Sequence, residues 1–160
     1  MGNEKLYSPS QIVAKLKGVT TRQILDLAEK GIIHPARETT GPGSPRLYDF
    51  ENIFDICICL ALRGKLPPSG KTLEHIKEIL ALIKRPIIDP ATGDTVDEFE
   101  FLYIEYNDVS NIGVFPITKK NQIPMRKLIK MFSYKYQPQH FCTYLLEIEN
   151  LRNFLKDHFE

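Results

Sequence analysis

The fold is decided by residues 8–33, which read SPSQIVAKLKGVTTRQILDLAEKGII. Ser8 is a good helix N-cap, and Gly18 suits the stop of a first helix. A second helix begins almost at once, because Thr20 or Thr21 can cap it and Gly31 can end it. Apolar side chains recur at helical spacing in both segments. Two short helices joined by so short a turn predict a helix-turn-helix.

The segments that follow extend this unit to about residue 85. Residues 32–37 and 46–48 are short extended pieces on either side of a Gly/Pro-rich tip, which predicts a β-hairpin. Asp49 can cap a third helix that runs to about Arg63, and a fourth helix is expected over about 72–84. A hairpin placed behind a helix-turn-helix is a wing. Residues 1–85 are therefore predicted to be a mainly α winged helix-turn-helix domain.

The rest of the chain changes character. Aromatic and β-branched residues at 99–106 predict a strand, and 112–117 can return as its partner. We also expect a helix over about 125–134. Residues 141–146 are expected to form a strand followed by a helix from about Glu149, with one long helix from Phe141 through Phe159 as the alternative. These elements predict a small α/β module at 98–160, joined to the first domain by a linker at 86–97.

Charge and composition narrow the function classes. Residues 1–85 carry 13 Lys and Arg against 9 Asp and Glu, a net charge of +4, and residues 86–160 carry 8 against 11, a net charge of −3. Any polyanion contact is thus expected in the first part. Three cysteines cannot form a disulfide scaffold and favour a reducing cytoplasm. The longest apolar run, 53–62, is too short to span a bilayer.

The first 85 residues resemble the winged-helix DNA-binding domain of MerR-type transcription regulators. The resemblance rests on the order and spacing of residues 7–14, 18–25 and 29–33, and on an Arg46-Leu47-Tyr48 wing return followed by an acidic helix start. It implies that the second helix enters the major groove and that the wing grips the adjacent backbone. Two features depart from the family: Leu25-Asp26-Leu27 stands where members commonly have Arg-Tyr-Tyr, and no long pairing helix follows the fourth helix.

The candidate DNA contacts are cations and hydroxyls at helix starts and on the hairpin arms, since these groups bind phosphates. Recognition helices use their N-terminal residues on base edges, where Arg22 can pair bidentately with guanine. The predicted DNA-binding residues are Ser8, Ser10, Thr20, Thr21, Arg22, Arg37, Arg46 and Tyr48.

Most of these residues also have a purely structural interpretation. Ser8 and Thr20 are good caps whatever the function, and Arg37 and Arg46 can be solvated charges. Tyr48 can be a core aromatic residue that pins the wing. Arg22 is the strongest functional candidate, because a position at a helix start coincides there with the resemblance.

Other chemistry has little support in the sequence. Cys57 and Cys59 are two apart on a helix and point in different directions, so we expect buried thiols there. A metal sensor that combines cysteines with Cys142 and His140 is the alternative. No phosphate-cradling glycine loop and no nucleophile elbow occurs, so we expect no enzyme, no cofactor and no metal.

The densest basic segment, Lys119 to Lys135, holds six Lys and Arg and no acidic residue. It is expected to be a solvated helix face, with an auxiliary phosphate or protein contact as the alternative.

The sequence therefore predicts a cytoplasmic, sequence-specific DNA-binding transcription regulator whose C-terminal module dimerises or senses a ligand. The resemblance implies action at promoters, where a dimer distorts an overlong spacer to aid RNA polymerase. Expected partners are double-stranded DNA, a second copy of the chain, RNA polymerase and an unknown small-molecule effector, with no membrane. Two alternatives stay open: an excisionase-like or architectural DNA-binding factor, and a protein-interaction adaptor without strong DNA affinity. Asp26 and the net charge of only +1 favour the adaptor.

Overall fold

The chain was analysed as a computed structural model. It describes residues 5–41, 43–64, 66, 72–84, 87–88, 95–96, 101–107, 111–117 and 141–159. Contacts between Cα atoms divide the chain into two compact units, Met1–Lys65 with Arg152–Glu160, and Leu66–Leu151. The domains predicted at 1–85 and 98–160 stay a prediction. The end of the chain joins the first unit, and no sequence signal had indicated this.

The first unit is built from the helices α1 (Pro9–Lys15), α2 (Thr21–Glu29) and α3 (Phe50–Arg63), together with α6 (Ile148–Phe159) from Arg152 onward. The predicted caps are confirmed. Ser8, Thr20 and Asp49 each accept a hydrogen bond from the backbone N–H three residues later, and the side chain at that later position accepts one from the cap backbone. These reciprocal bonds satisfy donors that a helix start otherwise leaves unpaired.

The core of the first unit is apolar and is drawn from every helix. Ile12, Ile24 and Leu27 are fully buried, as are Ile53, Tyr48 and Phe54. The turns between the helices depend on glycine. Gly18 and Gly31 have φ values of 82° and 60°, a conformation that side chains with a Cβ atom rarely adopt. The two helices can therefore turn back on each other within a few residues.

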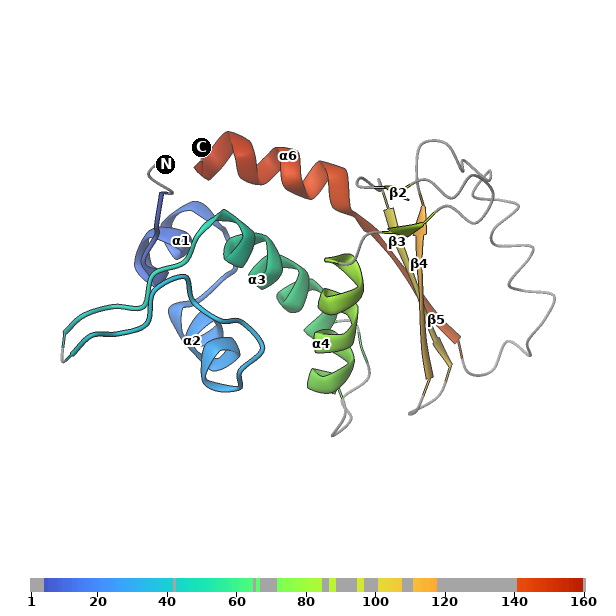
Figure 1. Ribbon diagram of the computed structural model, residues 1–160, viewed down its shortest axis with the longest axis horizontal. Helices are drawn as coiled ribbons and strands as arrows, with labels where there is room; N and C mark the ends of the chain where they lie inside the picture. The colour runs from blue at the N-terminus through green and yellow to red at the C-terminus, as the bar shows by residue number, and fades with distance from the viewer. Residues whose placement is uncertain are drawn as a thin grey trace. The chain divides into compact units, whose positions relative to one another are not determined.

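The hairpin predicted after α2 is reduced to one bridge pair among the described residues. Arg37 and Leu47 exchange both backbone hydrogen bonds, at 3.1 and 2.9 Å. A second bridge joins Tyr48 to Tyr7, at 2.8 and 2.9 Å, and so ties the residue before α3 to the strand-like residue before α1. The 34–47 loop extends from the core, and the Arg37–Leu47 and Tyr7–Tyr48 bridges hold its base (Figure 1).

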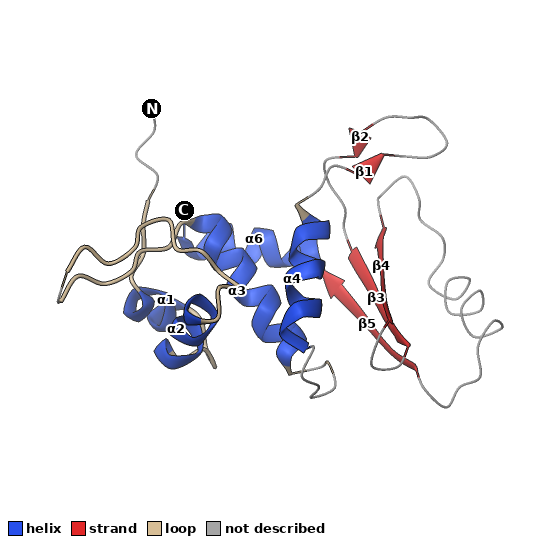
Figure 2. Cartoon of the chain, turned by 60° about the horizontal axis from the view of Figure 1, so that its bottom comes forward, coloured by secondary structure: helices blue, strands red, loops and turns tan. Residues whose placement is uncertain are grey.

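Among the described residues, the second unit holds α4 (Thr72–Ile83) and five strands. β3 (Phe101–Asn107) is the central strand of an antiparallel sheet with β4 (Asn111–Ile117) and β5 (Phe141–Glu147) on its two sides (Figure 2). The strand pair 99–106 and 112–117 was predicted from the sequence, to within a few residues.

Other predictions for this unit differ or lie outside the described residues. The segment expected to be a linker at 86–97 contains a short antiparallel pair, β1 (Ile87–Ile88) with β2 (Thr95–Val96). The helix expected at 125–134 and the basic segment from Lys119 to Lys135 lie outside the described residues. Within the described part of the chain, no helix is long and apolar enough to cross a membrane.

Candidate nucleic-acid interface

The start of α2 presents the side chains that a recognition helix needs. Thr20 is the N-cap: its Oγ1 accepts from the Gln23 backbone N–H at 3.2 Å, and the Gln23 Oε1 accepts from the Thr20 N–H at 2.9 Å. Thr21 and Arg22 occupy the first two helical positions, and both are exposed. Among the described residues Arg22 has no ion-pair partner, so its guanidinium is available for a ligand.

Arg22 shares a shallow, open hollow with other polar groups. Gln23 and Asp26 of α2 line this hollow with Arg22, and Arg63 reaches it from the last turn of α3. Residues three and four apart face the same side of a helix, so the α2 members form one continuous face. We call Arg22, Gln23, Asp26 and Arg63 the α2 face.

Asp26 is the most heavily paired residue of this face. Its Oδ2 accepts from the Arg63 Nη1 at 2.7 Å and from the Lys30 Nζ at 2.9 Å, and its Oδ1 lies 2.8 Å from the same Lys30 Nζ. These hydrogen bonds, with Lys30 the larger cause and Arg63 the second, lower the pKa of the Asp26 carboxyl below its usual value. Asp26 is therefore a charged acceptor whose charge two cations offset.

The 34–47 loop carries the two other predicted arginines. Arg37 is exposed and has no ion-pair partner within the described residues, whereas the Arg46 Nε donates to the Glu38 Oε2 at 3.0 Å. The loop is held at its base by Asn52 of α3. The Asn52 Oδ1 accepts from the Ala36 N–H at 2.9 Å, and its Nδ2 donates to the His34 carbonyl at 3.1 Å. One amide thus fixes the loop to the start of α3.

Tyr48 is where the structure disagrees with the predicted site. Its side chain is fully buried, at 0% exposure, and the buried hydroxyl has no hydrogen-bond partner among the described residues. Burial also raises the pKa of the Tyr48 phenol. A hydroxyl enclosed in the core does not reach a phosphate, so the predicted phosphate contact is wrong for this structure. The core position weighed as the alternative is the one observed.

At the start of each of α1 and α2, one hydroxyl residue caps the helix and a second one is exposed. Ser8 caps α1, and its Oγ lies 3.0 Å from the Oγ of Ser10. Ser10 itself is exposed. Ser8 and Thr20 therefore have the capping role expected of them, while Ser10 and Thr21 keep hydroxyls that face solvent.

The cysteines give no sign of a metal site. Cys59 is buried and Cys57 half-buried, and burial raises the pKa of the Cys57 thiol to about 11. Within the described ranges, which omit the side chains of Cys142 and His140, no group of three or more His, Cys, Asp or Glu is placed to hold a metal ion.

Sequence reasoning missed two features of this interface. The Asp26–Arg63 ion pair joins residues 37 positions apart, so no local pattern marks it. The hydrogen bonds from Asn52 to the 34–47 loop were also missed. Its position three residues after the Asp49 cap signals only the bonds between Asn52 and Asp49.

Comparison with known proteins gives one family. Residues 7–83 match the family described as MerR HTH family regulatory protein. The match covers all of α1, α2, α3 and α4, and it confirms the resemblance inferred from the sequence for the N-terminal region. It suggests a DNA-binding regulator. A search of the curated proteins found no match to the chain.

Proposed function

Because the N-terminal region is of the MerR helix-turn-helix type, we propose that the protein is a sequence-specific regulator of transcription that binds double-stranded DNA. In this proposal α2 is the recognition helix and enters the major groove, and the 34–47 loop is the wing. The observation that carries the proposal is Arg22, an exposed cation without an ion-pair partner among the described residues, at the second position of a well-capped helix inside the matched region.

Arg22 is proposed to read a guanine. A guanidinium has donors in a fixed fork that matches the O6 and N7 acceptors of guanine in the major groove, and such a pair contributes about 1–3 kcal/mol of discrimination. Helix-turn-helix proteins place the first residues of the recognition helix against base edges. The reciprocal bonds between Thr20 and Gln23 fix the start of α2, and with it the direction in which Arg22 leaves the helix.

The remaining proposed contacts are to phosphates. Ser10 and Thr21 are exposed hydroxyls at the starts of α1 and α2, and Arg37 is an exposed cation of the proposed wing. Arg46 contributes only if it exchanges Glu38 for a phosphate, because the two are paired in the free chain. Ser8 and Thr20 act indirectly, by fixing the helices on which the contacting residues stand.

Promoter binding as a homodimer completes the proposal. One helix-turn-helix reads only a short half-site, so specific recognition normally needs two copies. We assign dimerisation or the sensing of a small-molecule effector to the α/β module proposed at 98–160, and contact with RNA polymerase to the bound dimer. The adaptor alternative drew its support from Asp26 and from the net charge of only +1, and the charge of Asp26 is the part of that support that concerns α2 itself. Because Lys30 and Arg63 offset that charge, we do not carry it further.

The decisive experiment uses the full chain and a pool of random-sequence duplexes. Rounds of selection identify an enriched sequence, and fluorescence anisotropy then measures binding to that duplex and to a scrambled one. We expect Arg22→Ala to weaken binding to the selected duplex by about 5- to 150-fold, which corresponds to about 1–3 kcal/mol, and to change binding to the scrambled duplex far less.

Lys156→Ala is the matched control, because it removes an exposed cation of α6 for which the described residues show no partner. We expect it to leave both affinities nearly unchanged. If the wild-type chain enriches no sequence, the proposal is wrong. An equal loss on both duplexes for Arg22→Ala would make Arg22 a phosphate contact and not a base reader.

A further inference from the structure

The Asp26 carboxylate lies on the α2 face, where a recognition helix would meet the bases. Arg22 and Asp26 are four residues apart, on the same side of the helix, and both line the same hollow. Four residues advance an α-helix by about 6 Å, and base pairs are about 3.4 Å apart along the duplex. A base pair that the side chain at position 26 reaches is therefore about two base pairs, or fewer, from the base pair that Arg22 contacts.

Charge does not keep this face away from DNA. Lys30 and Arg63 contact the carboxylate of Asp26, and Arg22 lines the same hollow, while Glu29 adds one more carboxylate at the end of α2. Cations therefore outnumber carboxylates here. The Asp26 side chain is 20% exposed, so part of it remains within reach of a ligand.

A count of acceptor positions shows what that exposed part can do. An ionised carboxylate accepts at about four lone-pair sites, two on each oxygen. Lys30 and Arg63 occupy both sites of Oδ2, at 2.9 and 2.7 Å, whereas Oδ1 has one contact, with Lys30 at 2.8 Å. Among the described contacts, one acceptor site on Oδ1 remains, on a side chain that three interactions hold in place.

The chemistry of the major groove selects the partner of such an acceptor. Only two groups there donate hydrogen bonds, the N4 amino group of cytosine and the N6 amino group of adenine. Adenine places its N7 acceptor next to N6, and a carboxylate, which only accepts, is repelled by it. From this geometry we infer that Asp26 is a specificity-determining residue that reads a cytosine within about two base pairs of the guanine read by Arg22. The inference rests on the proposed function.

The test exchanges the acceptor for a side chain with a different base preference. Wild-type chain and Asp26→Asn are each carried through selection from the same random duplex pool. We expect the wild type to enrich a cytosine at one position near the Arg22-dependent guanine. An asparagine amide both donates and accepts, and it pairs bidentately with adenine N6 and N7, so we expect Asp26→Asn to replace that cytosine by adenine.

Anisotropy on duplexes that differ only at this position measures the size of the effect. A single mismatched base pair is expected to reduce wild-type affinity about 5- to 150-fold, and Asp26→Ala should bind all four bases there with nearly equal affinity. Glu74→Gln is the control for lost negative charge. Glu74 is an exposed carboxylate of α4 without a partner among the described residues, and its replacement should leave the base preference unchanged.

Three outcomes overturn the inference, and they differ from a failure of the proposed function. An unchanged enriched sequence for Asp26→Asn makes Asp26 a structural ion-pair residue. Uniformly tighter binding of Asp26→Asn to every duplex makes it a source of repulsion. If Asp26→Asn binds every duplex more weakly and keeps a native circular dichroism spectrum, the role of Asp26 is to position Arg63. In each case the wild type still enriches a site, whereas failure of the proposed function leaves the wild type with none.

Discussion

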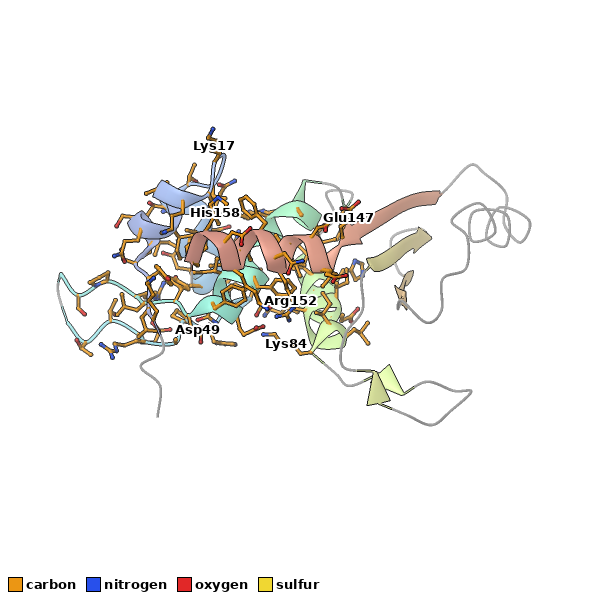
Figure 3. The ribbon with its side chains drawn as sticks, turned by 90° about the horizontal axis from the view of Figure 1, so that it is seen from above. Lys17, Asp49, Lys84, Glu147, Arg152 and His158 are labelled. Carbon is orange, nitrogen blue, oxygen red and sulfur yellow. The ribbon has the colours of Figure 1, made fainter. Side chains whose placement is uncertain are left out.

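The end of α6 is predicted to be an essential part of the first unit, and Phe159→Ala is the perturbation that tests it. Phe159 is 2% exposed, and its ring meets the ring of Tyr7 edge-on, with centroids 5.0 Å apart and planes at 87°. The Tyr7 hydroxyl donates to the Phe159 carbonyl, and the Lys15 Nζ donates to the His158 carbonyl at 2.5 Å. Figure 3 labels two residues of α6, Arg152 and His158, and His158 directly precedes Phe159 in the chain.

The magnitude follows from burial. Replacing a buried Phe by Ala costs about 3–5 kcal/mol in the free energy of unfolding, since transfer and cavity terms add. The edge-to-face ring contact contributes about 0.5–1.5 kcal/mol of such a loss. With a urea slope of about 2 kcal/mol/M, a loss of about 4 kcal/mol lowers the unfolding midpoint by about 2 M. A domain of ordinary stability, about 5–15 kcal/mol, loses a large fraction of it.

Urea unfolding of the full chain, followed by circular dichroism at 222 nm, measures this shift. Phe154→Ala is the matched control, because Phe154 is on the same helix but 45% exposed, with its ring against His158. Substitution of an exposed residue is expected to change stability by about 0.5 kcal/mol or less. Equal midpoints for Phe159→Ala and the wild type, or equal shifts for the two variants, would show that α6 does not stabilise the first unit.

Four further predictions follow from the described residues. Arg37→Ala should weaken binding to selected and scrambled duplexes alike and lower the slope of log affinity against log salt by about 0.9, and an unchanged slope would place Arg37 in solvent. Tyr48→Phe should raise the free energy of unfolding by about 1–3 kcal/mol and leave DNA affinity unchanged, because it removes a buried hydroxyl without a described partner; a loss of stability would mean that the hydroxyl is bonded. The Cys57 thiol, whose pKa burial raises to about 11, should stay protonated at pH 8 and alkylate more slowly in the native chain than in urea, as site-resolved mass spectrometry can show. Its rate should rise as the pH approaches 11, and equal native and unfolded rates at pH 8 would contradict the burial. The full chain should sediment as a dimer at micromolar concentration, and a monomer there would remove the dimerisation role from the module proposed at 98–160.

Local sequence signals account for the part of the fold that was predicted well. Ser8, Asp49 and either Thr20 or Thr21 were expected to cap helices. Ser8, Thr20 and Asp49 do so, each through a bond to a residue three positions away. A cap and its partner are separated by one helical turn, so the pattern is complete within four residues of sequence. The β3–β4 pair was predictable for a similar reason, because aromatic and β-branched residues flank a short turn-rich segment.

Contacts between distant residues account for what was not predicted. The docking of α6 depends on Tyr7 and Phe159, which are 152 positions apart, and each alone is an ordinary apolar residue. Tyr48 shows the same limit in the candidate site. The sequence left two interpretations of Tyr48 open, a hydroxyl that bonds a phosphate and a core aromatic residue. Pairing of its backbone with Tyr7 directs the ring into the core. Side-chain direction at such a bridge depends on a partner that sequence spacing does not reveal.

Asp26 shows why a departure from a family pattern has to be judged together with its partners in the fold. Taken alone, a carboxylate on a recognition helix repels phosphate and favours a protein that has lost DNA affinity. In the structure, Arg63 at the end of α3 and Lys30 at the end of α2 both form ion pairs with Asp26. Its negative charge is therefore offset, and the repulsion of phosphate is weaker than the sequence alone suggests. The same three contacts that offset the charge also orient the carboxylate and leave one acceptor site on Oδ1. In our proposal, a substitution that looks like a loss of DNA contacts instead changes the base that α2 reads.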